Sequence, residues 1–277
     1  MSIKSVIHRA LRYIVKGVPV KKTTAEITYL QPNGLLLGKK IIITGGGRGL
    51  GASMAEKFVK EGAEVLIVGR TEKTVQETAA RLGCKYLTLD VSRVESFAGF
   101  IQQADELLGG ANCLVNNAGI SLHENTFFDV TPETFDAQID TNFKGAYFLT
   151  QEFLRKAITN KRKANVLFIS SETGDTMDFR PYGFTKAAVN SMTQGLAYLF
   201  AKDNVRINAV APGVTASDMT GVKAEGDIYL AYNHTERAYL PEEVAETACF
   251  LLSDASGCVS GQIITCNNAK TVNARWK

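Results

Sequence analysis

The sequence predicts a single α/β domain with a doubly wound, mostly parallel seven-stranded sheet and helices on both of its faces. Three observations predict it. Short apolar runs alternate with amphipathic segments from about residue 39 onward. Most runs are continuously apolar, as strands are when helices cover both faces of their sheet. The first run ends in a glycine-rich turn before an amphipathic segment, which makes the domain Rossmann-type.

The expected strands follow one another as short apolar runs. They lie at residues 39–44, 64–69, 84–89, 113–116, 165–170, 205–210 and 262–266. Helices are expected between them, because parallel neighbours need a crossover connection. One helix begins at Thr131-Pro132-Glu133, with Thr131 as N-cap and proline at the first helical position. Another begins at Pro241-Glu242-Glu243.

Two regions are expected, an N-terminal extension (residues 1–37) and a dinucleotide-binding and catalytic domain (residues 38–277). The extension has six Lys or Arg residues and one acidic residue, Glu26, a net charge of +5. Apolar residues spaced by three and four predict a basic amphipathic helix over residues 1–18. Such a helix packs on its own domain or a second subunit, or else contacts an anionic membrane surface. An organelle transit peptide is a further alternative.

Composition narrows the class of protein. A net charge of +3 over 277 residues gives no reason to expect a nucleic-acid partner. No apolar run reaches the roughly 18 residues of a membrane span. The five cysteines form no CxxC pair, so we expect free thiols, no metal site and a reducing, cytoplasmic location.

A glycine-rich turn, TGGGRGLG at residues 44–51, follows the first expected strand. Glycines permit a tight turn and a close approach of the backbone to a pyrophosphate, and N–H groups at the next helix start attract the anion. The spacing is Gly-x3-Gly-x-Gly. The cofactor contacts expected here are Gly45, Arg48, Gly49, Leu50 and Gly51.

The end of the second expected strand indicates which cofactor binds. NAD enzymes usually carry a carboxylate there for the ribose 2′-hydroxyl, whereas this chain has Gly69-Arg70. A guanidinium binds a 2′-phosphate bidentately, and Arg48 adds a second positive charge nearby. The sequence therefore predicts NADP(H), with NAD(H) as the less favoured cofactor.

Later motifs carry a family resemblance. Asn116-Asn117-Ala118-Gly119 follows the fourth strand, and Tyr182-x3-Lys186 follows the fifth. With these motifs in order, the chain resembles the short-chain dehydrogenase/reductase family over about residues 38–268. The resemblance implies a catalytic set of Asn142, Ser171, Tyr182 and Lys186. It also implies cofactor contacts from Asp90, Val91, Asn116, Ala118, Gly119, Tyr182, Lys186, Pro212, Gly213, Val214 and Thr215.

The catalytic set makes chemical sense. Tyr182 and Lys186 are four residues apart and share one helix face. A phenol has a pKa near 10, and a nearby lysine cation is expected to lower it. Ser171, expected at the end of the fifth strand, would polarise a substrate carbonyl. The resemblance implies that Lys186 also binds the nicotinamide ribose and that Asn142 anchors a relay water. We therefore expect a carbonyl reductase in which NADPH gives hydride and Tyr182 gives a proton.

The chain departs from the family pattern at two places. Ser171 and Tyr182 are 11 residues apart, about two fewer than the family usually has, so the loop 172–181 should be tighter. Asn267-Asn268-Ala269 replaces the usual Asp-Gly-Gly, which puts the subunit contact near it in doubt.

Three variable stretches, 121–125, 172–181 and 217–239, should hold the substrate information. They contain His123, Asp175, Asp178, Arg180, Asp227, His234 and Arg237, with Met177, Phe179, Tyr229 and Tyr232. Their polarity favours a sugar- or polyol-like ketone. The alternatives are a 3-oxoacyl-thioester reductase and a non-catalytic NADP(H)-sensing scaffold. We expect a small carbonyl or alcohol substrate and a homodimer or homotetramer.

Overall fold

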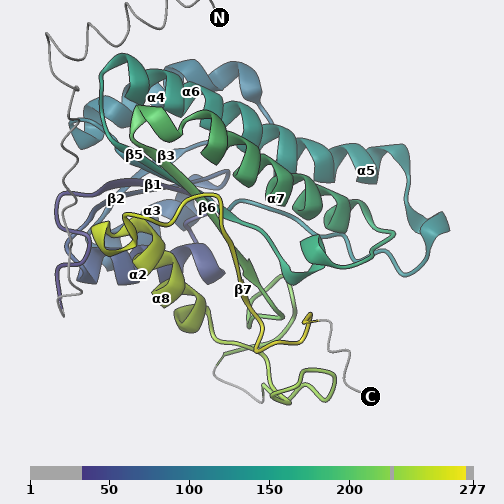
Figure 1. Ribbon diagram of the computed structural model, residues 1–277. Coiled ribbons are helices and arrows are strands. Elements are labelled where there is room, and N and C mark those ends of the chain that lie inside the picture. The colour runs from purple at the N-terminus through teal and green to yellow at the C-terminus, as the bar shows by residue number, and fades with distance from the viewer. Residues whose placement is uncertain (1–32, 225–227, 273–277) are drawn as a thin grey trace, which may run out of the picture.

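The computed structural model describes residues 33–224 and 228–272. The helix predicted over residues 1–18 and the candidate residue Asp227 lie outside the described residues. A seven-stranded, all-parallel sheet with strand order β3-β2-β1-β4-β5-β6-β7 forms the centre (Figure 1). Its strands are β1 Lys40–Thr44, β2 Glu64–Gly69, β3 Lys85–Thr88, β4 Cys113–Asn116, β5 Ala164–Ile169, β6 Val205–Pro212 and β7 Ile263–Cys266. The predicted fold class is confirmed.

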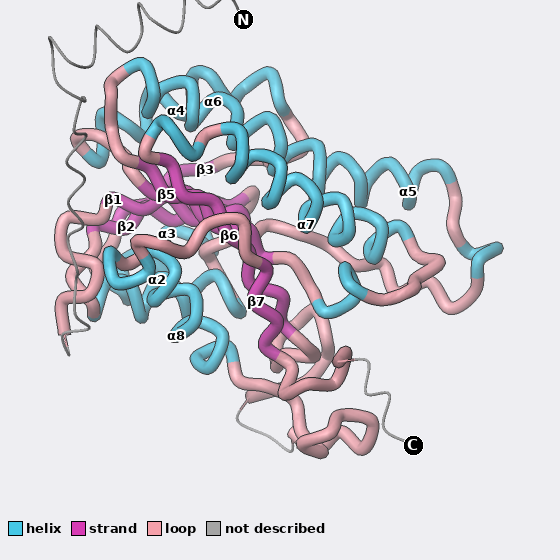
Figure 2. Tube along the Cα trace, viewed as in Figure 1, coloured by secondary structure: helices cyan, strands magenta, loops and turns pink. Residues whose placement is uncertain are grey.

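Helices cover both faces of this sheet, as Figure 2 shows. Helices α4, α6 and α7 lie on one face, and α2, α3 and α8 lie on the other. The helices are α2 Gly49–Lys60, α3 Glu72–Leu82, α4 Phe97–Leu108, α5 Pro132–Ile139, α6 Gly145–Thr159, α7 Pro181–Leu199 and α8 Pro241–Leu252. α5 begins as predicted, with Thr131 accepting a hydrogen bond from the Thr134 N–H.

Continuous apolar strands supply two cores, one on each face. Along β1, Ile42 packs with α4, α6 and α7, whereas Ile41 and Ile43 pack with α2, α3 and α8. All three are fully buried. Successive strand side chains point to opposite faces, so a sheet with two covered faces needs apolar residues at every position. This explains why the strands read as unbroken apolar runs.

The strand order places a topological switch beside β1. β2 and β3 lie on one side of β1, and β4 to β7 lie on the other. In open α/β sheets, ligands bind where loops diverge at the carboxyl ends of such strands. The loops after β1, β4, β5 and β6 therefore define the candidate site.

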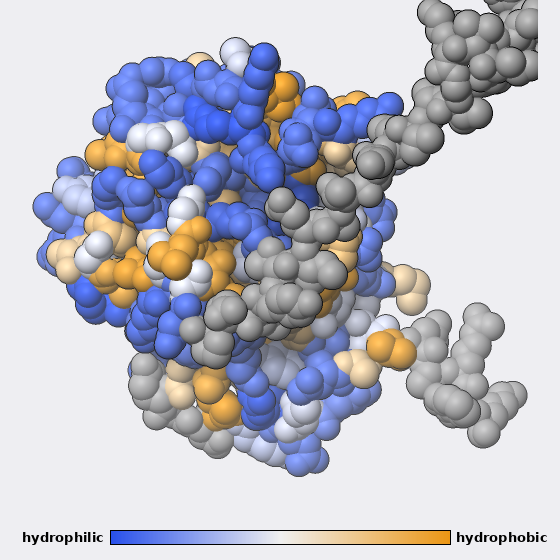
Figure 3. All heavy atoms as spheres, turned by 60° about the vertical axis from the view of Figure 1, so that its left-hand side comes forward, coloured by the Kyte–Doolittle hydropathy of each residue, from blue (hydrophilic) through white to orange (hydrophobic). Residues whose placement is uncertain are grey.

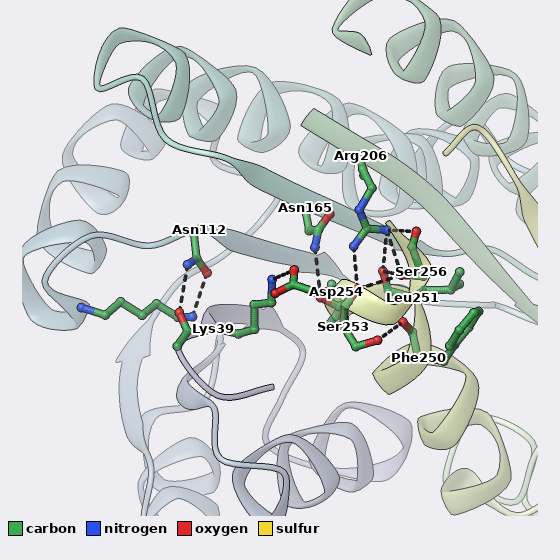
Figure 4. A network of polar contacts seen from close by, with 12 residues as sticks. Lys39, Asn112, Asn165, Arg206, Phe250, Leu251, Ser253, Asp254 and Ser256 are labelled. Atoms are coloured by element: carbon green, nitrogen blue, oxygen red, sulfur yellow. Dashed lines mark hydrogen bonds and ion pairs between the residues drawn. The ribbon is translucent and has the colours of Figure 1, made fainter. Parts of the chain in front are cut away.

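The opposite, amino end of the sheet is closed by a polar network (Figure 4). Arg206 at the start of β6 donates from Nη1 to the carbonyls of Leu251 and Ser256, both at 3.0 Å, and from Nη2 to the Ser253 carbonyl at 2.9 Å. Asn165 donates to the Leu252 carbonyl at 3.0 Å. Arg206 and Asn165 thus donate to carbonyl groups in the last turn of α8, where donors within the helix are missing, and in the turn that follows it.

Residues just before β1 belong to the packed domain. Leu36 is fully buried, and the Glu61 carboxylate accepts from the N–H groups of Gly34 and Leu35. In the view of Figure 3, most of the described surface is hydrophilic, with hydrophobic residues in separate patches. Within residues 33–224 and 228–272, no helix is both long and apolar enough to cross a membrane.

Candidate active site

The glycine-rich turn between β1 and α2 is closely packed. Gly45 and Gly49 have positive φ angles of 64° and 53°. A Cβ on Gly51 would lie 2.2 Å from the Gly45 carbonyl oxygen, so only glycine fits there. The first N–H groups of α2 have no partner within the helix. This backbone cradle fits the pyrophosphate of a dinucleotide.

Asn117 and Thr44, neither of them predicted as site residues, hold this turn. Asn117 donates from Nδ2 to the carbonyls of Thr44 at 2.8 Å and Gly45 at 3.1 Å. The Thr44 hydroxyl accepts from the N–H groups of Asn117 and Ala118, both at 3.0 Å. The loop after β4 and the glycine turn are thus one unit. Asn117 stands inside the quoted NNAG motif, which was the available signal.

The two arginines expected to select the cofactor are both exposed. Arg48 lies 3.2 Å from Asp218, and both side chains are 76% exposed. Arg70 follows β2, and within the described part of the chain it makes no hydrogen bond or ion pair. Burial tends to raise the pKa of Asp90, but hydrogen bonds from Ser92 and the charge of Arg70 lower it overall. Arg70 and Asp90 therefore lie near each other at the ends of β2 and β3.

The Asn116 side chain does not face the predicted cofactor cleft. It is buried, and its Nδ2 donates to the Thr150 hydroxyl of α6 at 2.9 Å. The side chain of Asn116, the last residue of β4, thus points toward α6, and its cofactor contact stays a prediction for the backbone. The Val91 side chain is also buried, and a Cβ on Gly145 would lie 2.1 Å from the Val91 carbonyl oxygen.

Ser171 and Tyr182 come together at the carboxyl end of β5. β5 ends at Ile169, so Ser171 lies two residues beyond the strand and caps the short 3-10 turn η4 (Glu172–Asp175). The Ser171 hydroxyl accepts from the hydroxyl of Thr173 at 3.0 Å. Tyr182 is the second residue of α7, and its side chain hydrogen-bonds with that of Ser171.

Lys186 lies one turn further along α7 and is 4% exposed. Its Nζ donates to the Ile169 carbonyl at 2.8 Å and lies 5.4 Å from the centre of the Tyr182 ring. A Cβ on Gly119 would lie 3.8 Å from this Nζ and 3.3 Å from the Asn142 Oδ1. One small region of the site therefore contains Lys186, Gly119 and Asn142.

Asn142 is held in a π-helical turn, η3 (Asp140–Lys144), between α5 and α6. Its side chain is buried and pairs with Ile120 in both directions. Nδ2 donates to the Ile120 carbonyl, and Oδ1 accepts from the Ile120 N–H, both at 2.8 Å. Single π turns occur frequently at functional sites. This one attaches Asn142 to the loop after β4.

Burial dominates the electrostatics of this group. It raises the pKa of Tyr182, although the hydrogen bond with Ser171 and the charge of Arg180 lower it in part. It also lowers the pKa of Lys186 from 10.5 to about 8. The net direction for the Tyr182 pKa is therefore upward, because desolvation of the phenolate outweighs the hydrogen bond and the nearby charge, and the lowering by Lys186 stays a prediction.

The segment after β6 closes the site on its other side. The Gly213 N–H donates to the Cys266 carbonyl at 3.0 Å, and Tyr239 N–H donates to the Val214 carbonyl at 2.9 Å. Thr215 is buried, and its hydroxyl donates to the Gly213 carbonyl at 3.0 Å. Residues 212–215 therefore lie at the carboxyl edge, as predicted, in a fixed conformation.

The variable loops place charges around Tyr182. Arg180 forms a two-pronged ion pair with Asp178, with Nε–Oδ1 at 2.8 Å and Nη2–Oδ2 at 2.9 Å. The negative charge of Glu124 also raises the pKa of Arg180. Glu124 was not among the predicted site residues. Gln138 of α5 donates to Glu124 Oε1 at 2.6 Å, while Glu124 Oε2 and Gln138 Oε1 are buried without a partner.

Other predicted loop residues lie apart from this group. The Met177 side chain is fully exposed, His123 Nε2 lies 2.8 Å from the Met219 carbonyl, and Arg237 pairs with Glu243 of α8. Across residues 33–224 and 228–272, no group of three or more His, Cys, Asp and Glu side chains is arranged to hold a metal.

The chain is similar to known dehydrogenases and reductases over most of its length. Residues 45–268 match the family model described as enoyl-(acyl carrier protein) reductase. The chain is 32% identical over 251 residues to 3alpha-hydroxysteroid dehydrogenase of Mediterraneibacter gnavus, an alignment covering 85% of this chain and 98% of that protein. It is 30% identical over 248 residues to L-rhamnose 1-dehydrogenase (NADP(+)) of Thermoplasma acidophilum, covering 85% and 97%. A solved structure of a short-chain type dehydrogenase/reductase from Mycobacterium ulcerans has a TM-score of 0.79 at 26% identity, covering 86% of this chain and 91% of that one.

Proposed function

Because this chain belongs to the short-chain dehydrogenase/reductase family, whose members are oxidoreductases of alcohol and carbonyl groups using a nicotinamide cofactor, we propose that it is an NADP(H)-dependent carbonyl reductase or alcohol dehydrogenase. One observation carries the proposal. Ser171, Tyr182, Lys186 and Asn142 come from three separate elements and meet at the carboxyl edge of the sheet. A protein that only binds the cofactor does not need this set.

In the proposed mechanism, the carbonyl oxygen lies between the hydroxyls of Ser171 and Tyr182. The bound nicotinamide supplies the hydride to the carbonyl carbon. Tyr182 gives its proton to the oxygen as negative charge develops there, and Ser171 stabilises that charge by donating a hydrogen bond. The resulting phenolate is stabilised by the Lys186 cation, 5.4 Å from the ring centre. Asn142, fixed by Ile120, holds the path by which the proton is replaced. Oxidation of an alcohol runs the same steps in reverse.

Removal of the Tyr182 hydroxyl tests the mechanism. We expect Tyr182→Phe to lower kcat by about 10²-fold or more, the usual scale of general acid–base catalysis, with the dissociation constant of NADPH within threefold of wild type. Tyr198→Phe is the matched control, because Tyr198 lies on the same helix and is 89% exposed. Turnover by Tyr182→Phe at the control rate would exclude the assigned role.

The preference for NADP(H) rests on charge at the ends of β1 and β2. Gly69 leaves no carboxylate at the end of β2 to repel a 2′-phosphate, Arg70 follows it as an exposed cation, and Arg48 is an exposed cation at the start of α2. We expect NADPH to bind at least tenfold more tightly than NADH, a difference of about 1.4 kcal/mol. Arg70→Ala should remove most of that preference in a fluorescence titration with both cofactors. Equal binding of both cofactors by the wild type would contradict the proposal.

A polar sugar- or polyol-like ketone is the proposed substrate. Asp178 and Arg180 lie close enough to Tyr182 to act on its pKa, and the carboxylate of Glu124 acts on the pKa of Arg180. A relative named for L-rhamnose supports this class.

Two other functions are alternatives to the reduction of a polyol-like ketone. A relative named 3-oxoacyl-[acyl-carrier-protein] reductase, from Aquifex aeolicus and 32% identical over 243 residues, supports a 3-oxoacyl-thioester reductase. A panel of sugar ketones, hydrophobic ketones and 3-oxoacyl thioesters with NADPH separates the two substrate classes. Turnover of thioesters alone would replace the polyol proposal. NADPH binding without turnover on the whole panel would favour the cofactor-sensing scaffold.

Assembly as a homodimer or homotetramer is also proposed. The outer side of α6 and α7 exposes Tyr147, Phe148 and Leu199, the last being 63% exposed. A shallow apolar hollow between these helices is lined by Phe143, Tyr147, Met192 and Leu196. An exposed surface on which several large apolar side chains lie together is typical of a subunit contact. Light scattering after size exclusion should give a dimer or tetramer, and Tyr147→Glu should shift it toward monomer.

A further inference from the structure

The residue directly after Ser171 is a buried carboxylate that the proposed mechanism does not use. The Glu172 side chain is 10% exposed. Lys270 Nζ lies 2.6 Å from its Oε1, and Asn267 Nδ2 donates to its Oε2 at 3.0 Å. Asn267 is itself 2% exposed and also donates to the Thr271 hydroxyl at 2.9 Å. Asn267 and Lys270 thus hold this carboxylate, although they lie 95 and 98 positions after Glu172 in the chain.

Three strand ends meet at this ion pair. Glu172 follows β5, Gly213 follows β6, and Asn267 follows β7. A Cβ on Gly213 would lie 3.0 Å from the Asn267 Cβ and 3.1 Å from Glu172 Oε2. The carboxylate therefore packs directly against the backbone of Gly213, on the segment expected to line the cofactor.

The short turn that carries Glu172 is held at its other end as well. Asp175 accepts from Asn190 Nδ2 of α7 at 2.9 Å and from the Thr265 hydroxyl of β7 at 3.5 Å. Lys270 Nζ also lies 5.1 Å from the centre of the Tyr232 ring. Both ends of η4 are thus fixed to β7 or the segment after it, and Ser171 is the residue that caps η4.

The chemical identity of residue 267 decides whether this arrangement is stable. The amide of Asn267 offers a donor to Glu172 Oε2, as a partly buried carboxylate requires. An aspartate at 267 would instead direct a second carboxylate at the first, with Lys270 as the one cation that the described contacts place on Glu172. Asparagine at residue 267, in place of the family's usual aspartate, is therefore the residue that is compatible with a glutamate at residue 172.

We propose that Asn267 and Lys270 are positioning residues of the active site: by holding the Glu172 carboxylate, they fix the Ser171 hydroxyl beside Tyr182 and the backbone of Gly213 beside the cofactor. This inference rests on the proposed function. Misplacement of a reacting or stabilising group by about 1 Å costs about 10²-fold in rate, so the effect falls mainly on kcat.

A charge-swap series tests it. Asn267→Asp, Glu172→Gln and the double variant are assayed for NADPH oxidation with the carbonyl compound that the wild type reduces fastest. Asn267→Asp should lower kcat at least tenfold, with the KM for the carbonyl compound within threefold. The double variant keeps one carboxylate, one amide donor and one lysine, and it should return kcat to within threefold of wild type. Asn268→Asp is the matched control, since the neighbouring Asn268 is exposed, and its kcat should not change.

The outcomes separate the possible failures. Wild-type turnover with an undiminished kcat in Asn267→Asp, or a loss that the double variant does not recover, overturns the inference and leaves the proposed function intact. No turnover by the wild type refutes the proposed function and the inference with it. If Asn267→Asp does not fold, Lys270→Gln decides, because Lys270 lies near the end of the described chain and its side chain is 22% exposed. It should lower kcat at least threefold, and an unchanged kcat overturns the inference.

Discussion

Replacing Lys186 with methionine should change how the stability of the protein depends on pH. Lys186 is 4% exposed, and burial lowers its pKa from 10.5 to about 8. Between these two values the unfolded chain binds more protons than the folded one, so stability is lost as the pH falls from 10.5 to about 8. With these pKa values, the cost of burying Lys186 is about 3 kcal/mol at pH 7 and about 1.4 kcal/mol at pH 9.5. Methionine has a similar length and no proton to gain.

Urea unfolding at a series of pH values between 7 and 9.5 measures this effect. The free energy of unfolding of wild type relative to Lys186→Met should rise by about 2 kcal/mol across the series. The lost hydrogen bond to the Ile169 carbonyl adds a cost to the variant that varies little with pH. Lys73→Met is the control, because the Lys73 side chain is 82% exposed. A constant difference between wild type and Lys186→Met would mean that Lys186 titrates like a surface lysine, and the reasoning from burial would be refuted.

Two further predictions concern the turn and the opposite edge of the sheet. Gly51→Ala should weaken NADPH binding at least tenfold in a fluorescence titration, because its Cβ would lie 2.2 Å from the Gly45 carbonyl oxygen. The control is Gly195→Ala in α7, where the added Cβ would meet nothing within 4 Å outside its own helix. This control should leave NADPH binding unchanged. Arg206→Met should lower the free energy of unfolding by about 3 kcal/mol, since it removes charge-assisted hydrogen bonds to the carbonyls of Leu251, Ser253 and Ser256. The remaining folded enzyme should keep its KM values, and a loss below about 1 kcal/mol in urea unfolding would contradict the proposed role of Arg206 at the end of α8.

The fold was predictable because its signals are local. Most strands are apolar runs, and Thr131-Pro132 marks the start of α5. The glycine turn was predictable for the same reason, because the required positive φ angles and close contacts restrict the residue type at Gly45, Gly49 and Gly51.

What the sequence did not predict depends on contacts between distant residues. Asn116 turns toward Thr150 because of its position in the sheet, which the NNAG motif alone does not reveal. The pKa of Tyr182 follows from the depth of its burial. The Glu172–Asn267 contact joins residues 95 positions apart, so residue 267 was recognised only as a departure from the family pattern.

The π turn at residues 140–144 has a consequence for how this site tolerates change. A π turn contains one residue more than an α-helical turn, so the helix after it is rotated by about 100° relative to an uninterrupted helix. The rotation lets Asn142 face Ile120 while Gly145 packs against the Val91 carbonyl. Deleting one residue here would leave the composition nearly intact and yet turn the two halves of the helix out of phase. The chain is therefore expected to accept many substitutions in this helix while rejecting changes in its length.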